Sequence, residues 1–122
     1  MIRIGVYGLG KISHRVIQGI LYANNADLYA VCSSSLEKAN AFKEEYGAKK
    51  AYDSYEEMLR DVNIDMVYIC TPNYLHAKHI QMGLNNHKHV ICEKPMCVST
   101  NELNECFDYA KKQNCFLMEA HK

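Results

Sequence analysis

The start of the chain places a buried-type strand directly against a glycine turn. The apolar run Ile2–Tyr7 is followed by Gly8 and Gly10, and an amphipathic stretch begins at Lys11. In this order Gly8 permits a tight turn out of the strand, and Gly10 lets an anion approach the backbone without meeting a Cβ, while the N–H groups of the following helix face that anion. Ser13 stands where such motifs carry a third glycine; that position serves close packing of helix on strand, so a small residue is a mild departure. The opening predicts a diphosphate-binding turn.

Strand and helix patterns alternate along the whole chain without a linker or a repeat. Helical stretches show apolar residues at helical spacing, and pairs of Ser and Glu three residues apart mark helix starts at Ser34, Ser54 and Ser99. Strands are expected at residues 2–7, 28–32, 50–52, 65–70, 89–92 and 116–118, with helices at 11–23, after Ser34, after Ser54, at 74–85 and after Ser99. Strands joined by helices require crossover connections. The predicted fold is therefore an α/β, doubly wound (Rossmann-type), mainly parallel six-stranded sheet of order 3-2-1-4-5-6, with helices on both faces and ligands at the carboxyl ends of the strands.

Length and composition narrow the classes of function. A chain of 122 residues forms one domain, residues 1–122. Its 14 basic and 14 acidic residues balance without a basic run, so neither nucleic acid nor a membrane is expected as a partner. A strand begins at once, which leaves no room for a signal peptide, and no apolar stretch is long enough to cross a membrane, so the expected location is the cytoplasm. The six cysteines lack Cys-x-x-Cys spacing and the histidine pairs lack a third ligand, so no metal site is expected.

The end of the second strand bears on the choice of cofactor. NAD sites carry a carboxylate about 20 residues after the last glycine position, whereas this chain has Ser33, 20 residues after Ser13. The hydroxyls of Ser33 and Ser34 and the charge of Lys38 favour a 2′-phosphate, and therefore NADP over NAD, although the usual arginine is missing. The alternative is that the serines only cap a helix and Lys38 is a solvated surface lysine.

The fourth strand is followed by Thr71, Pro72 and Asn73. Proline fixes the exit from the strand, and Asn73 is expected to cap the next helix. His76 lies one turn into that helix, near the expected crevice. The sequence does not separate two interpretations of His76, a cofactor contact and a structural histidine.

Glu93, Lys94 and Pro95 follow the fifth strand. A lysine beside the switch point of the sheet is expected to be partly buried, which would favour the neutral amine. That amine could exchange a proton with a substrate hydroxyl or carbonyl while hydride moves to or from a nicotinamide, with Glu93 orienting it. The sequence leaves both isomers of the Lys94–Pro95 bond open, with trans the more common form of an X-Pro bond. A surface Glu-Lys-Pro turn is the alternative.

These three motifs stand in the order and approximate spacing of one enzyme family. The chain resembles, over essentially its whole length, the N-terminal nucleotide-binding domain of the glucose-fructose oxidoreductase/inositol dehydrogenase/MocA (Gfo/Idh/MocA) family of NAD(P)-dependent oxidoreductases. The closing residues 116–120 also resemble the sixth strand of that family.

The resemblance implies roles for particular residues. Cofactor contacts would come from Gly8, Gly10, Ile12, Ser13, Ser33, Ser34, Lys38, Thr71, Pro72, Asn73, His76, Glu93 and Lys94. The first four would meet the pyrophosphate, and the residues from Ser33 to Lys38 would meet the adenosine ribose or its phosphate. Glu93 and Lys94 would lie beside the nicotinamide. Lys94 would be the catalytic residue, assisting proton transfer with a sugar-like or other small hydroxy or carbonyl substrate.

The second domain of the family has no counterpart in this sequence. In the family that domain supplies most substrate contacts, a further catalytic histidine or aspartate and usually the dimer surface, and His121 is not assumed to replace it. The chain is therefore expected to be the cofactor domain of a homo-oligomeric enzyme, inactive alone, with apolar surface exposed beyond the sixth strand. Two alternatives stay open: a stand-alone, non-catalytic dinucleotide-sensing module, and a methyltransferase domain, against which Ser33 and the Glu93–Pro95 motif argue.

Overall fold

The structure is a single six-stranded sheet in which every neighbouring pair of strands is parallel. It is a computed structural model that describes residues 1–97 and 99–120; His121 and Val98, the last residue of the loop expected after the fifth strand, lie outside the described residues. The strand order is β3-β2-β1-β4-β5-β6, as predicted. The strands are β1 (Ile2–Tyr7), β2 (Ala26–Cys32), β3 (Lys50–Tyr52), β4 (Met66–Ile69), β5 (His89–Cys92) and β6 (Leu117–Glu119). The helices are α1 (Lys11–Tyr22), α2 (Leu36–Tyr46), α3 (Tyr55–Leu59), the 3₁₀ turn η1 (Asn73–Leu75), α4 (His76–Asn85) and α5 (Thr100–Lys112).

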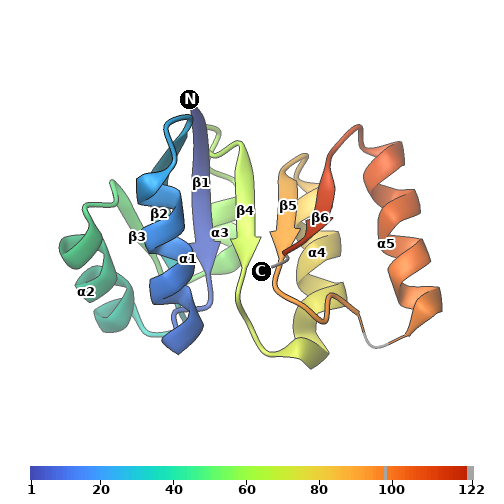
Figure 1. Cartoon of the computed structure of the whole chain (residues 1–122), viewed down its shortest axis with the longest axis horizontal. Helices are drawn as coiled ribbons and strands as arrows, with labels where there is room; N and C mark the ends of the chain where they lie inside the picture. The colour runs from blue at the N-terminus through green and yellow to red at the C-terminus, as the bar shows by residue number, and fades with distance from the viewer. Residues whose placement is uncertain (98, 121–122) are drawn as a thin grey trace.

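Apolar strand residues are buried where helices cover the sheet. Val6, Val31, Val67 and Val90 are at most 1% exposed. One core lies between the sheet and α1 and α2, and the other lies between the sheet and α3, α4 and α5. Figure 1 shows α1 and α2 in front of β1, β2 and β3, with α3 and α4 behind the sheet. None of the described helices lies in front of β4 and β5 in this view.

Helix starts differ from the sequence prediction at two places. Ser35, rather than Ser34, caps α2, where its side chain accepts a bond from the N–H of Lys38. The reason is local: the Ser33 hydroxyl accepts from the Ser35 N–H at 3.2 Å, which keeps the chain in a turn for one more residue. The predicted caps at Ser54 and Ser99 are confirmed.

The predicted Asn73 cap is wrong. Pro72 occupies the N-cap position of η1, no side chain caps that turn, and Asn73 is its first residue. The α-helix begins three residues later, at His76. A proline N-cap followed by a 3₁₀ turn redirects the chain without a side-chain bond.

Apolar side chains are exposed around β6, where Phe116 is 70% and Met118 is 54% exposed. Of the described helices, none has the length and apolar character that a membrane crossing requires. Cys32, Cys92 and Cys106 are fully buried, and all six cysteines are free. Within the described ranges, no three His, Cys, Asp or Glu side chains are grouped so that they could hold a metal ion.

Candidate functional site

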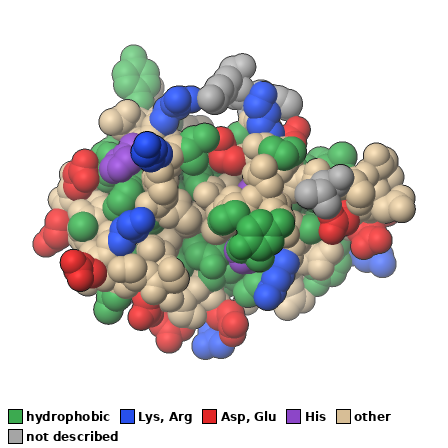
Figure 2. All heavy atoms as spheres, turned by 90° about the horizontal axis from the view of Figure 1, so that it is seen from below, with side chains coloured by type: hydrophobic (Ala, Val, Ile, Leu, Met, Phe, Trp, Pro, Cys, Tyr) green, Lys and Arg blue, Asp and Glu red, His purple; other side chains and the backbone are tan. Residues whose placement is uncertain are grey.

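Three strand ends meet at one cavity, as the strand order requires. This hollow, here called the glycine cavity, has a volume of about 570 Å³ and lies at the carboxyl edge of β1, β2 and β4. Figure 2 views that edge, where backbone and apolar side chains occupy the middle and most acidic side chains in view lie toward the rim. The cavity is lined by Tyr7, Gly8, Leu9, Gly10, Ser33, Ser34, Lys38, Cys70, Thr71, Pro72, Leu75 and His79.

The chain requires glycine at Gly8 and at Gly10 for different structural reasons. Gly8 has φ +97°, and a Cβ there would lie 2.8 Å from the backbone of Cys70 and of Thr71, so this residue lets β1 and the end of β4 approach closely. Gly10 has no atom within 4 Å of the position of a Cβ, because it faces the cavity. A side chain at Gly10 would fill space that is open to a ligand.

The N-terminus of α1 faces this space without a side-chain partner. Gly10 is its N-cap residue and supplies no side-chain bond, and the first turn holds no acidic residue. The first N–H groups of a helix need acceptors, and its dipole favours an anion there. A pyrophosphate would satisfy both requirements, so the residues at this turn fit the diphosphate of a dinucleotide.

Ser13 and Ile12 do not line the glycine cavity. Ser13 is fully buried, its N–H donates to the carbonyl of Gly10, and its hydroxyl bonds to the same oxygen. It therefore serves the packing of α1, which is the role predicted for the third motif position. Ile12 lines a second cavity on the other side of the α1 N-terminus.

Polar residues after β2 line one end of the glycine cavity, and their side chains are neutral or positively charged. Ser33 and Ser35 are both occupied in bonds that organise the turn before α2. Ser34 is exposed and lines the cavity, as does Lys38 in the first turn of α2. No carboxylate is among the described residues that line the cavity. A phosphate placed here would therefore meet a cation and no like charge.

Thr71 and His79 form a hydrogen-bonded pair on the β4 side of the cavity. The Thr71 hydroxyl lies 2.8 Å from Nδ1 of His79. The His79 ring also packs on Tyr7, with ring centroids 4.8 Å apart, and against Tyr55 at 5.3 Å. Burial, with smaller contributions from the charges of Lys78 and His76, lowers the pKa of His79 to about 4. The imidazole is consequently neutral at pH 7 and offers one donor and one acceptor.

His76 and Asn73 lie away from the cavity lining. His76 is fully buried at the start of α4, where its ring nitrogens lie next to the carbonyl oxygens of Thr71 and Pro95. Asn73 is exposed in η1. Of the two interpretations of His76 in the sequence, the structural one agrees with this geometry.

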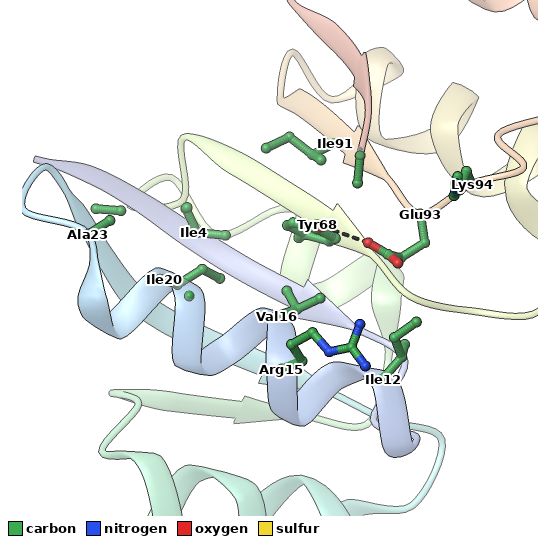
Figure 3. A pocket seen from close by; sticks show the side chains of 13 residues that line it. Ile4, Ile12, Arg15, Val16, Ile20, Ala23, Tyr68, Ile91, Glu93 and Lys94 are labelled. Atoms are coloured by element: carbon green, nitrogen blue, oxygen red, sulfur yellow. Dashed lines mark hydrogen bonds between the residues drawn. The ribbon is translucent and has the colours of Figure 1, made fainter. Parts of the chain in front are cut away.

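Glu93 and Lys94 line the second cavity, here called the α1 groove. It has a volume of about 600 Å³ and runs between α1 and the strands β4 and β5 (Figure 3). Its floor is apolar, with Ile4, Val16 and Ile91 among the lining residues. Its polar end holds Glu93, whose carboxylate accepts a bond of 2.6 Å from the Tyr68 hydroxyl. Burial and then this bond raise the pKa of Tyr68.

Two expectations about this loop are corrected. Lys94 is exposed rather than partly buried. Glu93 is engaged by Tyr68, and no ion pair joins it to Lys94 in the part of the chain that the structure describes. Of the two isomers that the sequence left open for the Lys94–Pro95 bond, the structure has cis. The trans form of an X-Pro bond is favoured by only about 0.5–1 kcal/mol, so the contacts of a folded loop can select the other isomer.

Residues 2–121 match the profile of a family described as an oxidoreductase family with an NAD-binding Rossmann fold (GFO_IDH_MocA). The chain belongs to this family. The match covers both cavities and every strand of the sheet.

Curated relatives and solved structures agree. A scyllo-inositol 2-dehydrogenase (NADP(+)) of Bacillus subtilis is 36% identical over 122 residues, which are 100% of this chain and 37% of that protein. A trans-1,2-dihydrobenzene-1,2-diol dehydrogenase of Xenopus tropicalis is 36% identical over 118 residues, 95% of this chain and 36% of that protein. The chain thus spans little more than a third of the length of these relatives.

Two solved structures show the same fold with cofactor. A 3-ketoreductase from Actinomadura kijaniata in complex with NADP and TDP-benzene aligns with a TM-score of 0.94 at 29% identity, covering 97% of this chain and 36% of the other. Scyllo-inositol dehydrogenase from Lactobacillus casei with bound NAD(H) and scyllo-inositol aligns at 0.89 and 25% identity, covering 98% and 36%.

Sequence reasoning missed several residues that line the glycine cavity: Tyr7, Leu9, Cys70, Leu75 and His79. The positions of two of these residues in the sequence could have identified them as lining residues. Tyr7 is the last residue of a predicted strand, and His79 follows Leu75 at i+4, on the same face of a helix. Cys70 gave no chemical signal, since burial raises the pKa of its thiol to about 12 and leaves it a small apolar residue.

Proposed function

We propose that this chain is the cofactor-binding domain of an NAD(P)-dependent oxidoreductase that moves hydride between nicotinamide and a small hydroxy or carbonyl compound. One observation supports this above the others. The uncapped N-terminus of α1 opens into the glycine cavity beside Gly8, whose conformation and close backbone contacts tolerate no side chain. Family membership agrees with it.

The proposed binding mode follows the geometry of the strand ends. Gly8, Gly10 and the first turn of α1 hold the pyrophosphate. Ser33, Ser34 and Lys38 receive the adenosine ribose, while Thr71 and Pro72 contact the dinucleotide from the β4 side. Ile12, Glu93 and Lys94 line the neighbouring α1 groove, on the side where the nicotinamide half is proposed to lie.

NADP is proposed as the preferred cofactor, with NAD as the second choice. The cavity offers Lys38 and the exposed side chain of Ser34, and the described lining contains no carboxylate to repel a 2′-phosphate. The inositol dehydrogenase of Bacillus subtilis and a D-xylose 1-dehydrogenase of Haloferax volcanii are both named for NADP(+). The Lactobacillus casei enzyme, which binds NAD(H), shows that the same fold takes either cofactor.

Lys94 is proposed to assist proton transfer. The nicotinamide, when bound, supplies or accepts the hydride. Lys94 carries an exposed ammonium group directly after β5, and its Nζ could hold or deliver the proton that a hydroxyl or carbonyl oxygen exchanges. Glu93, the neighbouring acid, is already bonded to the Tyr68 hydroxyl.

The substrate and the assembly are proposals drawn from the relatives. Their names include inositol, xylose and glucoside dehydrogenases, so a sugar-like polyol is the proposed substrate class. The part of the relatives that this chain does not span is proposed to supply the substrate contacts and the surface of a homo-oligomer. Six free cysteines fit a reducing compartment, and the cytoplasm is the proposed location.

A titration of the chain with NADPH, NADH and S-adenosylmethionine tests the proposal. Tighter binding of NADPH than of NADH, with no binding of S-adenosylmethionine, is expected. Tighter binding of NADH would overturn the NADP preference alone. Binding of S-adenosylmethionine and of neither dinucleotide would overturn the oxidoreductase assignment.

A further inference from the structure

Two cysteine side chains meet beside the loop that carries Lys94. Cys97 lies in that loop, and Cys106 lies on α5. Their Sγ atoms are 3.9 Å apart, the distance of a weak S–H···S hydrogen bond in which either sulfur is the donor. Both thiols are free, and neither residue lines the glycine cavity or the α1 groove. The function proposed above therefore gives this pair no role.

The two thiols differ in access and in freedom to move. Cys106 is fully buried in the core between the sheet and α5, whereas Cys97 is only partly buried, so a small reagent reaches Cys97 first. Helix α5 fixes the backbone of Cys106, while Cys97 belongs to no helix or strand. A disulfide bond is about 2.05 Å long, so the two sulfur atoms must approach each other by about 1.9 Å. Side-chain rotation and a small shift of the loop are enough for this approach.

We propose that Cys97 and Cys106 form a redox modification site, at which a low-molecular-weight disulfide such as oxidised glutathione converts the two thiols into a disulfide bond. The Cys97 thiolate attacks one sulfur of the reagent, which forms a mixed disulfide and releases one thiolate. The Cys106 sulfur then attacks Sγ of Cys97 and expels the second thiolate. Two protein thiols are thereby oxidised to one disulfide, one reagent disulfide is reduced, and the two protons pass to the two released thiolates.

The surroundings of Cys97 determine how fast the exchange runs. Burial raises the pKa of Cys97 to about 12, and nearby groups add smaller contributions in the same direction. These groups are Cys106 and Glu102 on α5 and Glu119 on β6, and Cys92 on β5 is a further thiol near Cys97. Thiolate is therefore scarce at pH 7, so the exchange is slow there and faster in mildly alkaline solution.

The disulfide would join the Lys94 loop to α5. In the reduced chain this part of the loop is held to β6 by the Met96 N–H, which donates to the Glu119 carboxylate at 2.8 Å. Lys94 lies three residues before Cys97, so oxidation would add a covalent bond close to the residue that is proposed to transfer the proton. An effect of this bond on catalysis rests on the proposed function, but formation of the bond does not.

Mass spectrometry of the native chain tests the proposal. The folded chain is incubated without denaturant in oxidised glutathione at about pH 8.5, and the remaining thiols are then blocked in acid. Cleavage after glutamate and lysine residues separates four cysteines into four peptides: those of Cys92, Cys97, Cys106 and Cys115. We expect peptides 94–102 and 106–111 to be linked in most chains, with a mass about 2 Da below the sum of the reduced peptides, and to separate again in dithiothreitol.

Three results would overturn the proposal: an unreacted Cys97, glutathione that stays on Cys97 without closure, or a bond from Cys97 to a cysteine other than Cys106. The experiment contains no cofactor. Failure of NADPH to bind would therefore count against the proposed function and leave this result unaffected.

Serine variants test the two steps separately. Cys106→Ser removes the second thiol, so glutathione should accumulate on Cys97 to roughly ten times its level in the unsubstituted chain. The matched control is Cys115→Ser, which removes another partly buried cysteine and should leave the yield of the Cys97–Cys106 bond unchanged. Equal amounts of glutathione on Cys97 with and without Cys106 would refute the second step. If a variant does not fold, the linked peptides of the unsubstituted chain still decide whether the bond forms.

Discussion

Replacing Gly8 by alanine tests the close approach on which the glycine cavity depends. The added Cβ would lie 2.8 Å from the Cys70 carbonyl carbon and the Thr71 nitrogen, and 2.9 Å from the Cys70 oxygen. All three atoms are backbone, so no side-chain rotation can relieve the overlap. The residue would also keep φ +97°, which L-residues rarely adopt.

The two penalties can be added. The left-handed backbone costs an alanine about 1–2 kcal/mol. The overlap with the β4 loop acts like overpacking of a core and costs about 1–3 kcal/mol. The free energy of unfolding should therefore fall by about 2–5 kcal/mol, a large part of the ~5–15 kcal/mol typical of a domain. Thermal denaturation should begin roughly 10 °C earlier or more.

Gly10→Ala is the matched control, because it adds the same methyl group two residues away. No atom lies within 4 Å of its Cβ position, and its φ of −90° suits alanine. The free energy of unfolding should fall by about 1 kcal/mol, since replacing a favourable N-cap residue by alanine typically costs that much. The methyl group would instead stand where the pyrophosphate is proposed to approach, so the Kd for NADPH should rise at least roughly tenfold.

Urea denaturation and an NADPH titration of both variants separate the two roles. Gly8→Ala unfolding at the same urea concentration as the unsubstituted chain would show that β1 and the β4 loop are not in this close contact. Unchanged NADPH affinity in Gly10→Ala would show that the diphosphate does not lie at this turn.

Three further substitutions probe separate parts of the site. Lys38→Ala should weaken NADPH binding roughly tenfold, because a charge-assisted bond is lost, and leave NADH binding nearly unchanged. Equal losses of affinity for both cofactors would contradict a contact between Lys38 and the 2′-phosphate. Lys94→Ala should leave the Kd for NADPH unchanged in this chain. In a protein that also carries a substrate domain, the same substitution should lower kcat by orders of magnitude. Near-normal turnover there would show that Lys94 does not assist proton transfer. His79 has its pKa lowered from 6.5 to about 4, so the unfolded chain takes up this proton at a higher pH than the folded chain. The free energy of unfolding should therefore decrease as the pH falls from about 6.5 to about 4, by up to about 3 kcal/mol, and His79→Gln should flatten that slope in urea titrations.

The fold was predictable because its signals are local and repeated. Strands β1, β3 and β5 have the bounds that the sequence predicts, and the strand order follows from crossover handedness and the glycine turn. Helix α2 ends at Gly47, whose φ of +78° is the left-handed conformation that glycine commonly supplies after a helix. The strand bounds and the helix end each depend on residues within a few positions of one another.

The site was only partly predictable, because its details depend on contacts between distant residues. Sequence spacing brought Gly8, Ser34 and Thr71 to one edge, and the structure places them around one cavity. The partner of Glu93 is Tyr68, 25 residues earlier, and no motif marks that pair. The Ser35 cap differed from the prediction through a single bond within the turn, where two neighbouring serines are chemically equivalent.

The exposure of Lys94 bears on which groups would make its side chain reactive in the proposed proton transfer. A lysine exchanges protons most readily near neutral pH when its ammonium is desolvated. Around Lys94, the described residues fix the backbone through Tyr68, His76 and Glu119, but they leave the side chain in solvent. The groups that would desolvate it must therefore come from the bound dinucleotide, the substrate or the part of the relatives beyond this chain. If Lys94 has the proposed role, the chain would supply the placement of the proton-transfer group, and its partners in the complete site would supply the environment that makes the group reactive.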